Sequence, residues 1–366
     1  MTPRVLALID RSALRHNLAQ VRRRAPGRRV MAAIKADGYG HGAVEVARTL
    51  RDCDAFAVAC IEEAVVLREA GIQQPIALLE GVLSAEEAEQ AVALNLQIVL
   101  YEPWQLSLLD QLPFAGEPAQ FWIKLDTGMH RLGFDPTTVP ALTEWLAKRG
   151  SQGFCGWMTR LACADERNNP MTSTQLERFQ RLLDGLPGPR SIANSAGIIG
   201  WPAAHADWVR PGLMLYGVSP MPEQSASELG LRPAMQLRSR LIATRHLAAG
   251  EPVGYGAQWR APQDTRIGVV AVGYADGWHR CLPSGTPVSW QGETLQTIGR
   301  VSMDMICVEL GNCPAQVGDD IVLWGAGGVA VEQIAERAGT LAYEMMCGLT
   351  QRVRLRYLDH ADPVTR

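Results

Sequence analysis

The residues with the clearest chemical potential lie at positions 33–42, which read AIKADGYGHG. Lys35 follows a short apolar run, residues 30–34, and glycines at 38, 40 and 42 relax the chain just beyond it. A desolvated lysine at a strand end loses part of its preference for the charged form, which makes it a candidate Schiff-base nucleophile or general base. The alternative is a strand-end lysine that points into water. Lysine is rare here, at 35, 124 and 148 only.

The elements that must position Lys35 follow from an alternation of apolar runs and amphipathic segments. Strands are expected near residues 30–34, 56–59, 76–79, 97–101, 121–125, 154–158, 191–194 and 208–210. Helices are expected over residues 61–70, 85–94, 103–112, 139–149 and 174–183. Eight strand-helix units over about 200 residues predict an α/β fold, a (β/α)8 barrel of the TIM type.

The strand-helix repeat ends at residues 220–228, a segment rich in proline and serine. Beyond it, strand-like runs at residues 237–242, 267–272, 288–290, 305–309 and 321–324 are separated by turns, with one helix expected around 331–338. We therefore predict two domains, a barrel over residues 1–230 and a mainly β domain over residues 231–366.

Composition excludes several functional classes. A net charge of -3 and a pI near 6.2 argue against a nucleic-acid binder, and we interpret the arginines at 22–24 and 28–29 as a solvated helix end and loop. No apolar run approaches a membrane span or a signal peptide, so we expect a cytoplasmic protein without a membrane partner. Eight cysteines without metal-ligand spacing predict no metal site and no disulfide framework; we expect reduced thiols, mostly in the core.

Barrel geometry gives these segments a common location, because active sites of such barrels lie at the carboxyl ends of the strands and phosphate often binds after strands 7 and 8. Residues 194–197 (NSAG) follow the seventh predicted strand, and residues 210–213 (RPGL) follow the eighth. Both offer small residues and backbone amides suited to a phosphate. A lysine facing such a phosphate site indicates pyridoxal 5'-phosphate, although NSAG alone, without the barrel context, is more typical of an ordinary turn.

Five motifs in order resemble those of alanine racemases, the fold-type III pyridoxal-phosphate enzymes, over nearly the whole chain. They are residues 34–42 (IKADGYGHG), 124–133 (KLDTGMHRLG), 207–212 (DWVRPG), 252–256 (PVGYG) and 299–304 (GRVSMD). The resemblance implies interconversion of L-alanine and D-alanine, for peptidoglycan or for alanine catabolism. Lys35 would hold the cofactor covalently and act as one proton-transfer base, and Tyr255 of the partner subunit would be the second. It therefore implies a homodimer with shared sites.

The resemblance also implies the remaining site residues. The cofactor phosphate would contact Tyr39, Ser195, Gly212, Leu213 and Tyr343, beside Asn194. Arg131 would bind the substrate carboxylate, with the backbone amide of Met303 near it, and a carbamylated Lys124 would orient Arg131. Asp165, Tyr274 and Asp304 would be supporting residues around the entrance. The alternatives are an ordinary ion pair between Lys124 and Asp126, and Met303 as a core filler.

Arg210 would face the pyridine nitrogen of the cofactor. A guanidinium does not give up its proton, so the ring would be a poorer electron sink than one beside an acidic residue. This favours prompt reprotonation of the substrate carbon. Decarboxylases of the same plan usually carry an acidic residue there, so Arg210 separates the two reactions.

One position departs from the family. Residues 158–165 read MTRLACAD, with Arg160 where the family usually has a histidine beside the cofactor ring. Arg160 can still donate a hydrogen bond to Tyr255 and favour its tyrosinate, but it cannot accept a proton and would bring a second guanidinium against Arg210. We expect an altered rate or pH profile.

Three other interpretations stay open. A racemase of broader substrate range would differ at Tyr343 and the entrance. A pyridoxal-phosphate carrier without turnover would leave Tyr255 and everything after residue 231 unexplained. A relative with impaired turnover is raised by Arg160 alone.

Overall fold

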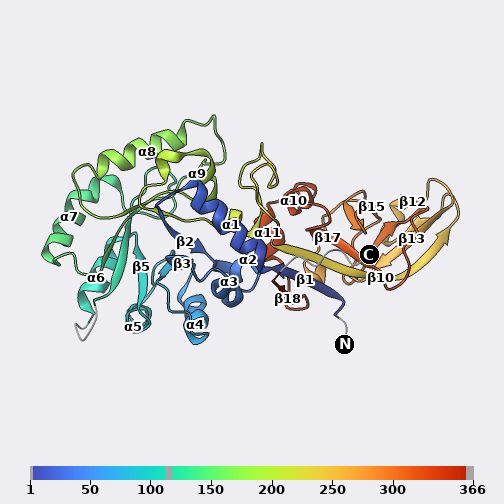
Figure 1. Ribbon diagram of the computed structural model, residues 1–366, viewed down its shortest axis with the longest axis horizontal. Coiled ribbons are helices and arrows are strands. Elements are labelled where there is room, and N and C mark those ends of the chain that lie inside the picture. The colour runs from blue at the N-terminus through green and yellow to red at the C-terminus, as the bar shows by residue number, and fades with distance from the viewer. Residues whose placement is uncertain (1–2, 113–117, 360–366) are drawn as a thin grey trace.

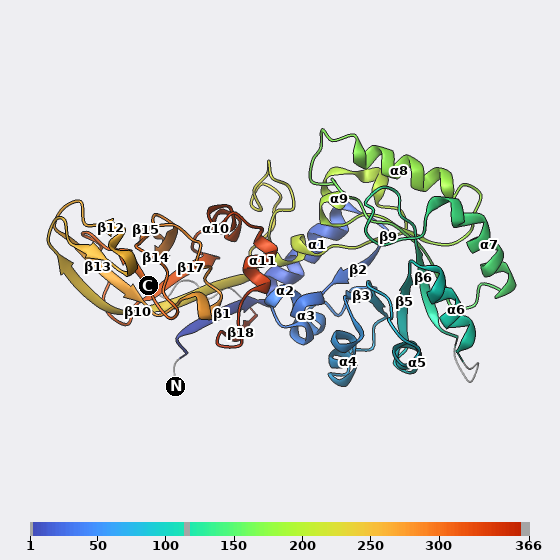
Figure 2. The same cartoon turned by 180° about the vertical axis from the view of Figure 1, so that it is seen from behind.

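The computed structural model describes residues 3–112 and 118–359, which form a barrel and a β domain side by side (Figure 1). Among these residues, no helix is both long and apolar enough to cross a membrane. The first labelled strand, β1 (Val5–Asp10), lies with the β domain in both views (Figures 1 and 2). The first strand of the chain therefore begins outside the barrel.

The barrel is closed and parallel, with each strand paired to the next in sequence and the last paired to the first. Its strands are β2 (Arg29–Ala33), β3 (Ala55–Val58), β4 (Ile76–Leu78), β5 (Leu96–Leu100), β6 (Gln120–Lys124), β7 (Phe154–Met158), β8 (Arg190–Ser191) and β9 (Trp208–Val209). All eight overlap the predicted strands. The predicted (β/α)8 barrel is confirmed.

Helices cover the outside of the barrel, as both views show (Figures 1 and 2). They are α1 (Arg11–Arg24), α3 (Ala43–Thr49), α4 (Ile61–Glu69), α5 (Ala85–Ala93), α6 (Pro103–Gln111), α7 (Val139–Lys148), α8 (Met171–Leu182) and α9 (Ser195–Gly200), whereas the segment labelled α2 (Lys35–Gly40) is a turn of positive φ that follows β2. Local sequence sets their starts: the Ser84 side chain accepts a hydrogen bond from the Glu87 amide, and a capping box with Pro103 opens α6. All five helices predicted in this region are confirmed.

The barrel interior is a packed core. Small residues on β3 and β4 leave room for two tryptophans from β6 and β9, and the rings of Trp122 and Trp208 meet edge to face with centroids 5.8 Å apart. The Trp122 indole nitrogen donates to Gln97 Oε1 over 2.8 Å, so its buried N–H is satisfied. With the interior filled, a ligand has access only at the ends of the barrel.

The second domain is built on an eight-stranded sheet with the order β13-β16-β15-β14-β17-β10-β1-β18. Its members from the C-terminal half are β10 (Met235–Leu247), β13 (Thr265–Val270), β14 (Pro287–Trp290), β15 (Glu293–Ile298), β16 (Ile306–Glu309), β17 (Asp320–Gly325) and β18 (Arg354–Leu358). A separate hairpin pairs β11 (Pro252–Val253) with β12 (Trp259–Arg260). The helices here are α10 (Val331–Ala338), as predicted, and α11 (Ala342–Cys347). The mainly β character is confirmed.

The N-terminal strand β1 (Val5–Asp10) belongs to this second sheet, where it pairs antiparallel with β10 and parallel with β18. The chain thus leaves the β domain, builds the barrel and returns. The domain boundary predicted between residues 230 and 231 stays a prediction. Residues 5–10, which that boundary assigns to the first domain, pair with strands of the second.

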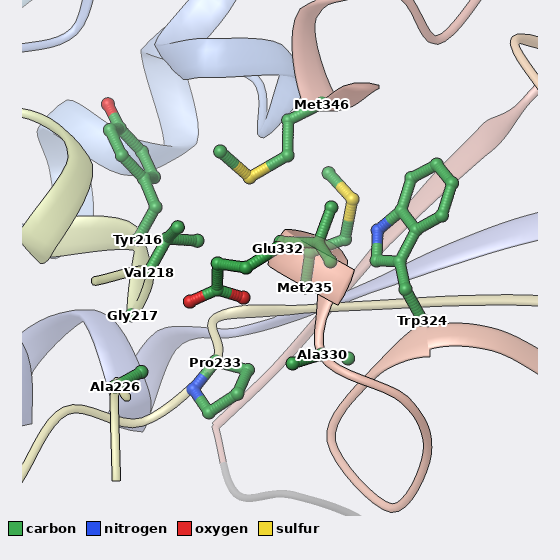
Figure 3. Close-up of a pocket in the computed structure, with 12 residues that line it drawn as sticks. Tyr216, Gly217, Val218, Ala226, Pro233, Met235, Trp324, Ala330, Glu332 and Met346 are labelled. Atoms are coloured by element: carbon green, nitrogen blue, oxygen red, sulfur yellow. The ribbon is translucent and has the colours of Figure 1, made fainter. Parts of the chain in front are cut away.

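The junction of the two domains encloses a small cavity of about 40 Å³ (Figure 3). Tyr216 and Val218 line it from the barrel side, while Trp324 and Met346 line it from β17 and α11. The backbone amide of Ser219 donates to Glu332 Oε1 on α10 over 3.0 Å. Apolar contacts and this hydrogen bond hold the barrel against the second domain.

The cysteine prediction was partly wrong. All eight thiols are free, as expected, but only Cys53 is fully buried, and Cys281 and Cys347 are exposed. Cys347 lies on α11 against α2, so its exposure reflects the open barrel mouth and not a core position.

We predict that Gly217→Ala is far more destabilising than Gly27→Ala. Both glycines have positive φ, of 78° and 72°, but a Cβ at Gly217 would lie 1.7 Å from the Arg232 carbonyl oxygen, whereas one at Gly27 would meet nothing within 4 Å. Gly27→Ala should cost about 1 kcal/mol of backbone strain, and Gly217→Ala more than about 2 kcal/mol. Urea unfolding of both variants measures this, and equal losses would contradict it.

Candidate active site

Lys35 begins a left-handed turn at the carboxyl end of β2. Residues 36–39 all have positive φ, between 50° and 63°, although three of them are not glycine. Such a conformation costs about 1–2 kcal/mol for each non-glycine residue and is kept only where the surroundings hold it. Within the turn, Asp37 Oδ1 accepts from the Ala43 amide over 2.8 Å. The predicted location of Lys35 at a strand end is therefore correct, and its backbone is more constrained than a flexible glycine loop.

Tyr39, the last residue of this turn, is buried between two other tyrosines. Its ring centroid is 4.8 Å from that of Tyr216 and 5.6 Å from that of Tyr343 on α11. Its hydroxyl faces the backbone of Gly212, where an added Cβ would lie 2.6 Å from the oxygen. Burial raises the pKa of Tyr39 well above its usual range, so the phenol stays protonated and can donate a hydrogen bond there.

The loop after β8 and the loop after β9 meet through Ser195. Its hydroxyl oxygen accepts from the backbone amides of Gly212, over 2.9 Å, and Met214, over 3.3 Å. The hydroxyl hydrogen of Ser195 remains available for another acceptor. Asn194 caps α9 by accepting from the Gly197 amide over 2.9 Å. Tyr39, Ser195 and Gly212 are thus brought together, as the sequence predicted.

Arg210 is buried and held by oxygen atoms from neighbouring strands. Its Nη1 donates to Ser191 Oγ over 2.5 Å, and its Nη2 donates to the carbonyl oxygens of Thr159 (2.5 Å) and Ile192 (3.2 Å). Its Nε has no acceptor among residues 3–112 and 118–359. Burial, and then the charge of Arg160, lower the pKa of Arg210 to about 9. The predicted approach of a second guanidinium is confirmed.

Lys124, at the end of β6, lies among these positive charges. Burial, followed by the charges of Arg210, Arg160 and Arg131, lowers the pKa of its amine to about 7. The described residues include no ion pair between Lys124 and Asp126, because the Asp126 carboxylate accepts from the Gly128 and His130 amides and pairs with His130 at 3.0 Å. The ion-pair alternative was wrong.

A cleft of about 910 Å³ opens beside this cluster. Of the predicted site residues, its lining includes Arg160, Asp165, Asn194, Leu213 and Tyr343. Its other wall is formed by residues 219–227 and by α10. The volume lies within the range of ligand pockets in proteins.

Apart from Tyr343, which contacts Tyr39 at the mouth, the predicted residues of the second domain lie on segments between its strands. Tyr255 lies in the turn between β11 and β12, and Figures 1 and 2 show β12 at the opposite end of the domain from α2. Tyr255 is 71% exposed and Met303 52% exposed, so Met303 is not a core filler. Tyr274 is also exposed. Arg352 connects this region by contacting Asp304 (2.8 Å) and Asp276 (3.2 Å).

The barrel is closed and parallel, and a β domain follows it. One mouth of the barrel carries a lysine turn, hydroxyl and amide donors and a buried arginine. This is the architecture of fold-type III pyridoxal-phosphate enzymes. Residues 9–220 match the family described as "Alanine racemase, N-terminal domain", and residues 234–357 match "Alanine racemase, C-terminal domain". The chain belongs to the alanine racemase family.

Individual relatives agree along nearly the full length. The alanine racemase of Halorhodospira halophila is 48% identical over 359 residues, covering 96% of this chain and 97% of its own. The biosynthetic alanine racemase of Escherichia coli O6:H1 is 46% identical over 355 residues, covering 96% and 98%. The crystal structure of the biosynthetic alanine racemase from Pseudomonas aeruginosa is similar at a TM-score of 0.91 and 48% identity, covering 98% of this chain and 100% of that one.

Several residues of the site escaped the sequence reasoning. Ser191 and Thr159 hold Arg210, Tyr216 supports Tyr39 and donates to the Ala33 carbonyl oxygen over 3.0 Å, and Arg352 links the entrance loops. Thr159 directly follows the strand predicted at 154–158, and Ser191 begins the strand predicted at 191–194. Their positions at strand ends were a usable signal. Nothing in the local sequence of Tyr216 or Arg352 indicated their partners.

We predict a pH-dependent stability difference between the unsubstituted protein and Lys124→Met. Because the folded-state pKa of about 7 is below the usual 10.5, the unfolded chain binds a proton that the folded chain excludes between these values. The contribution of Lys124 to the free energy of unfolding should therefore rise from about pH 7 to about pH 10. At about 1.4 kcal/mol for each pKa unit, the rise should total a few kcal/mol at most.

Urea unfolding in carbon-dioxide-free buffer measures this difference. Lys148→Met is the control, because Lys148 is exposed and pairs with Glu144 at 2.7 Å. A Lys124→Met difference that stays constant with pH would contradict the shifted pKa.

Proposed function

We propose that this chain interconverts L-alanine and D-alanine with pyridoxal 5'-phosphate, as a homodimer whose sites are shared between subunits. The observation that carries this proposal is the meeting of the Lys35 turn, the donors of Tyr39 and Ser195, and buried Arg210 at one barrel mouth, in a chain of the alanine racemase family.

The residues at the mouth fit this cofactor. The Gly212 backbone forms a cradle that a Cβ would fill, and the Tyr39 and Ser195 hydroxyls beside it can donate to a phosphate, with the amide of Leu213 and the hydroxyl of Tyr343 as further donors. The free Nε–H of Arg210 suits a pyridine nitrogen. When bound, pyridoxal phosphate would supply an aldehyde for an amine and a ring that accepts electron density from the substrate carbon.

Lys35 would hold the cofactor and, once substrate has displaced it, move a proton at one face of the substrate α-carbon. Tyr255 of the partner subunit would hold the proton at the opposite face. Removal on one face and return on the other inverts the carbon, which needs two groups on two sides. The exposure of Tyr255 and its distance from α2 in one chain support a site completed by a second copy.

Arg131 and Lys124 would bind and orient the substrate carboxylate. Arg131 is exposed and forms no hydrogen bond with the described residues, so its guanidinium is free to bind an anion. A Lys124 with a pKa of about 7 has a substantial neutral fraction, about half, at neutral pH. Its amine would add carbon dioxide, forming an N–C bond and releasing a proton, and the resulting carbamate would bind Arg131. The Met303 amide would contact the same carboxylate.

Arg210 would donate a hydrogen bond to the ring nitrogen without transferring its proton. Asn194, Asp165, Tyr274 and Asp304 would shape the surroundings, Asn194 by capping α9 and Asp304 through Arg352. Tyr343, at 38% exposed, would limit side-chain size at the entrance and so favour alanine over larger amino acids.

We propose that the enzyme works in the cytoplasm and supplies D-alanine for peptidoglycan precursors. The word "biosynthetic" in the names of the E. coli and P. aeruginosa relatives supports this role over alanine catabolism.

Mixing two inactive variants tests the shared site. Lys35→Ala and Tyr255→Phe should each abolish most formation of D-alanine from L-alanine, because each removes one of the two bases. After unfolding and refolding together in equal amounts, half of the dimers would be mixed, and each mixed dimer would have one intact site, so about a quarter of the unsubstituted activity should return.

Refolding of each variant alone is the control. No recovery in the mixture would contradict shared sites, and no racemisation by the unsubstituted protein with pyridoxal phosphate would contradict the function itself.

We predict that Arg160→His changes the pH–rate profile. The constant charge of Arg160 favours the tyrosinate of Tyr255 of the partner subunit, so histidine, neutral above its usual pKa, should shift the corresponding limb toward higher pH by about one unit. Arg167→His, at an exposed arginine on the following loop, is the control. Identical profiles would show that position 160 is not coupled to the base.

A further inference from the structure

Glu63 links the ends of two neighbouring barrel strands next to Lys35. It lies on α4 and is half-buried. Its Oε1 accepts from the backbone amide of Ala36 over 2.6 Å, and its Oε2 accepts from the backbone amide of Ala59 over 2.8 Å. Ala36 follows β2 and Ala59 follows β3, so one carboxylate spans two strand ends at the mouth.

The first of these amides belongs to the peptide bond between Lys35 and Ala36, where the left-handed turn begins. An acceptor there fixes the orientation of that peptide plane, and through it the direction in which the Lys35 side chain leaves the backbone. Two other side-chain contacts are local: Asp37 accepts from the Ala43 amide at the start of α3, and His41 Nδ1 lies 2.9 Å from the Tyr39 carbonyl oxygen. The Glu63 carboxylate instead joins the first peptide of the turn to α4 on the barrel wall.

We infer that Glu63 is a positioning residue for the amine of Lys35, holding the turn so that this amine keeps its place at the barrel mouth. The inference rests on the proposed function, because a direction of Lys35 matters only if Lys35 carries the cofactor and moves a proton. Misplacement of a reacting group by about 1 Å can cost about a hundredfold in rate, so the orientation of one peptide plane is a plausible determinant of turnover.

Two backbone N–H groups facing one side chain require two acceptor oxygens. A carboxylate provides both, and charge assistance makes each hydrogen bond stronger. A glutamine of the same shape provides one oxygen and one NH2, so it would turn a donor toward a donor at either Ala36 or Ala59. The substitution Glu63→Gln therefore removes the bridge while it keeps side-chain volume and length.

The charges that act on the pKa of Cys347 indicate that Lys35 and Glu63 lie close to the same thiol. Burial raises the pKa of the Cys347 thiol, the charge of Lys35 lowers it, and the charge of Glu63 raises it. Both charges thus act on one thiol of α11, which packs against α2. The carboxylate and the amine lie on the same side of the barrel mouth.

The test compares Glu63→Gln with Glu62→Gln. Glu62 is the exposed neighbour on α4, so the control makes the same chemical change one residue away and removes the same charge. On the protein without cofactor, hydrogen exchange followed by mass spectrometry should show faster exchange over residues 34–42 and 55–62 in Glu63→Gln alone. This readout reports the bridge itself and needs no activity.

The cofactor and the reaction provide the second set of readouts. With pyridoxal phosphate, borohydride should fix the cofactor on Lys35 more slowly in Glu63→Gln than in the control. For alanine racemisation, kcat should fall about tenfold or more, while KM stays within about twofold, because the loss concerns the reacting group and not substrate binding.

The outcomes separate the two proposals. If the unsubstituted protein and Glu62→Gln racemise alanine and Glu63→Gln matches them in exchange, fixation and kcat, the positioning role is wrong. If Glu63→Gln only lowers the unfolding midpoint while kcat for each bound cofactor is unchanged, Glu63 is structural and the inference is overturned. If the unsubstituted protein does not racemise alanine, the proposed function itself fails.

Discussion

The accumulation of positive charge at the barrel mouth is the constraint on which the rest of the site depends. Burial and the charge of Arg160 lower the pKa of Arg210, and burial together with the charges of Arg210, Arg160 and Arg131 lowers the pKa of the Lys124 amine. The nearby Asp126 carboxylate lies 3.0 Å from His130 and forms no ion pair with Lys124 among the described residues, so its opposing charge offsets this positive charge only in part. Buried like charges are unfavourable unless anions offset them. A phosphate, a substrate carboxylate and a carbamate on Lys124 are three such anions, so the proposed ligands would offset the positive charge at the mouth.

Besides its positive charge, the barrel mouth has a strained backbone and close packing, which fix the positions of its side chains. The left-handed turn after Lys35 brings the Tyr39 hydroxyl onto Gly212, and Tyr216 and Tyr343 close around its ring. A turn with several unfavourable φ values cannot hold itself, which is why it is anchored to α4 through Glu63 and covered by α11. Segments separated by some 300 residues of sequence therefore cooperate to orient one amine.

Much of this arrangement could be predicted from the sequence, because barrel strands and amphipathic helices have strong local signals. The periodic runs gave the eight barrel strands and α10, and barrel topology then brought Lys35, Ser195 and Arg210 to one mouth. Long-range pairing could not be predicted: residues 5–10 were assigned to the barrel domain without a predicted strand, but they form β1, which pairs with β10 and β18. The left-handed φ of Ala36 and the bridge from Glu63 were also inaccessible, since they depend on atoms that only the folded barrel brings together.

The position of Tyr255, the proposed second base, links assembly to chemistry. Tyr255, Met303 and Tyr274 lie on loops of the second domain, exposed and held by backbone contacts such as the Tyr274 amide to the Ser302 carbonyl oxygen, over 3.1 Å. Exposed aromatic and methionine side chains on ordered loops are typical of a surface that another protein covers. The β11–β12 hairpin that carries Tyr255 lies away from α2 of the same chain, so under the proposed two-base mechanism a monomer would lack the base opposite Lys35. Association would then be a requirement of racemisation, since each subunit would contribute the group that the other lacks.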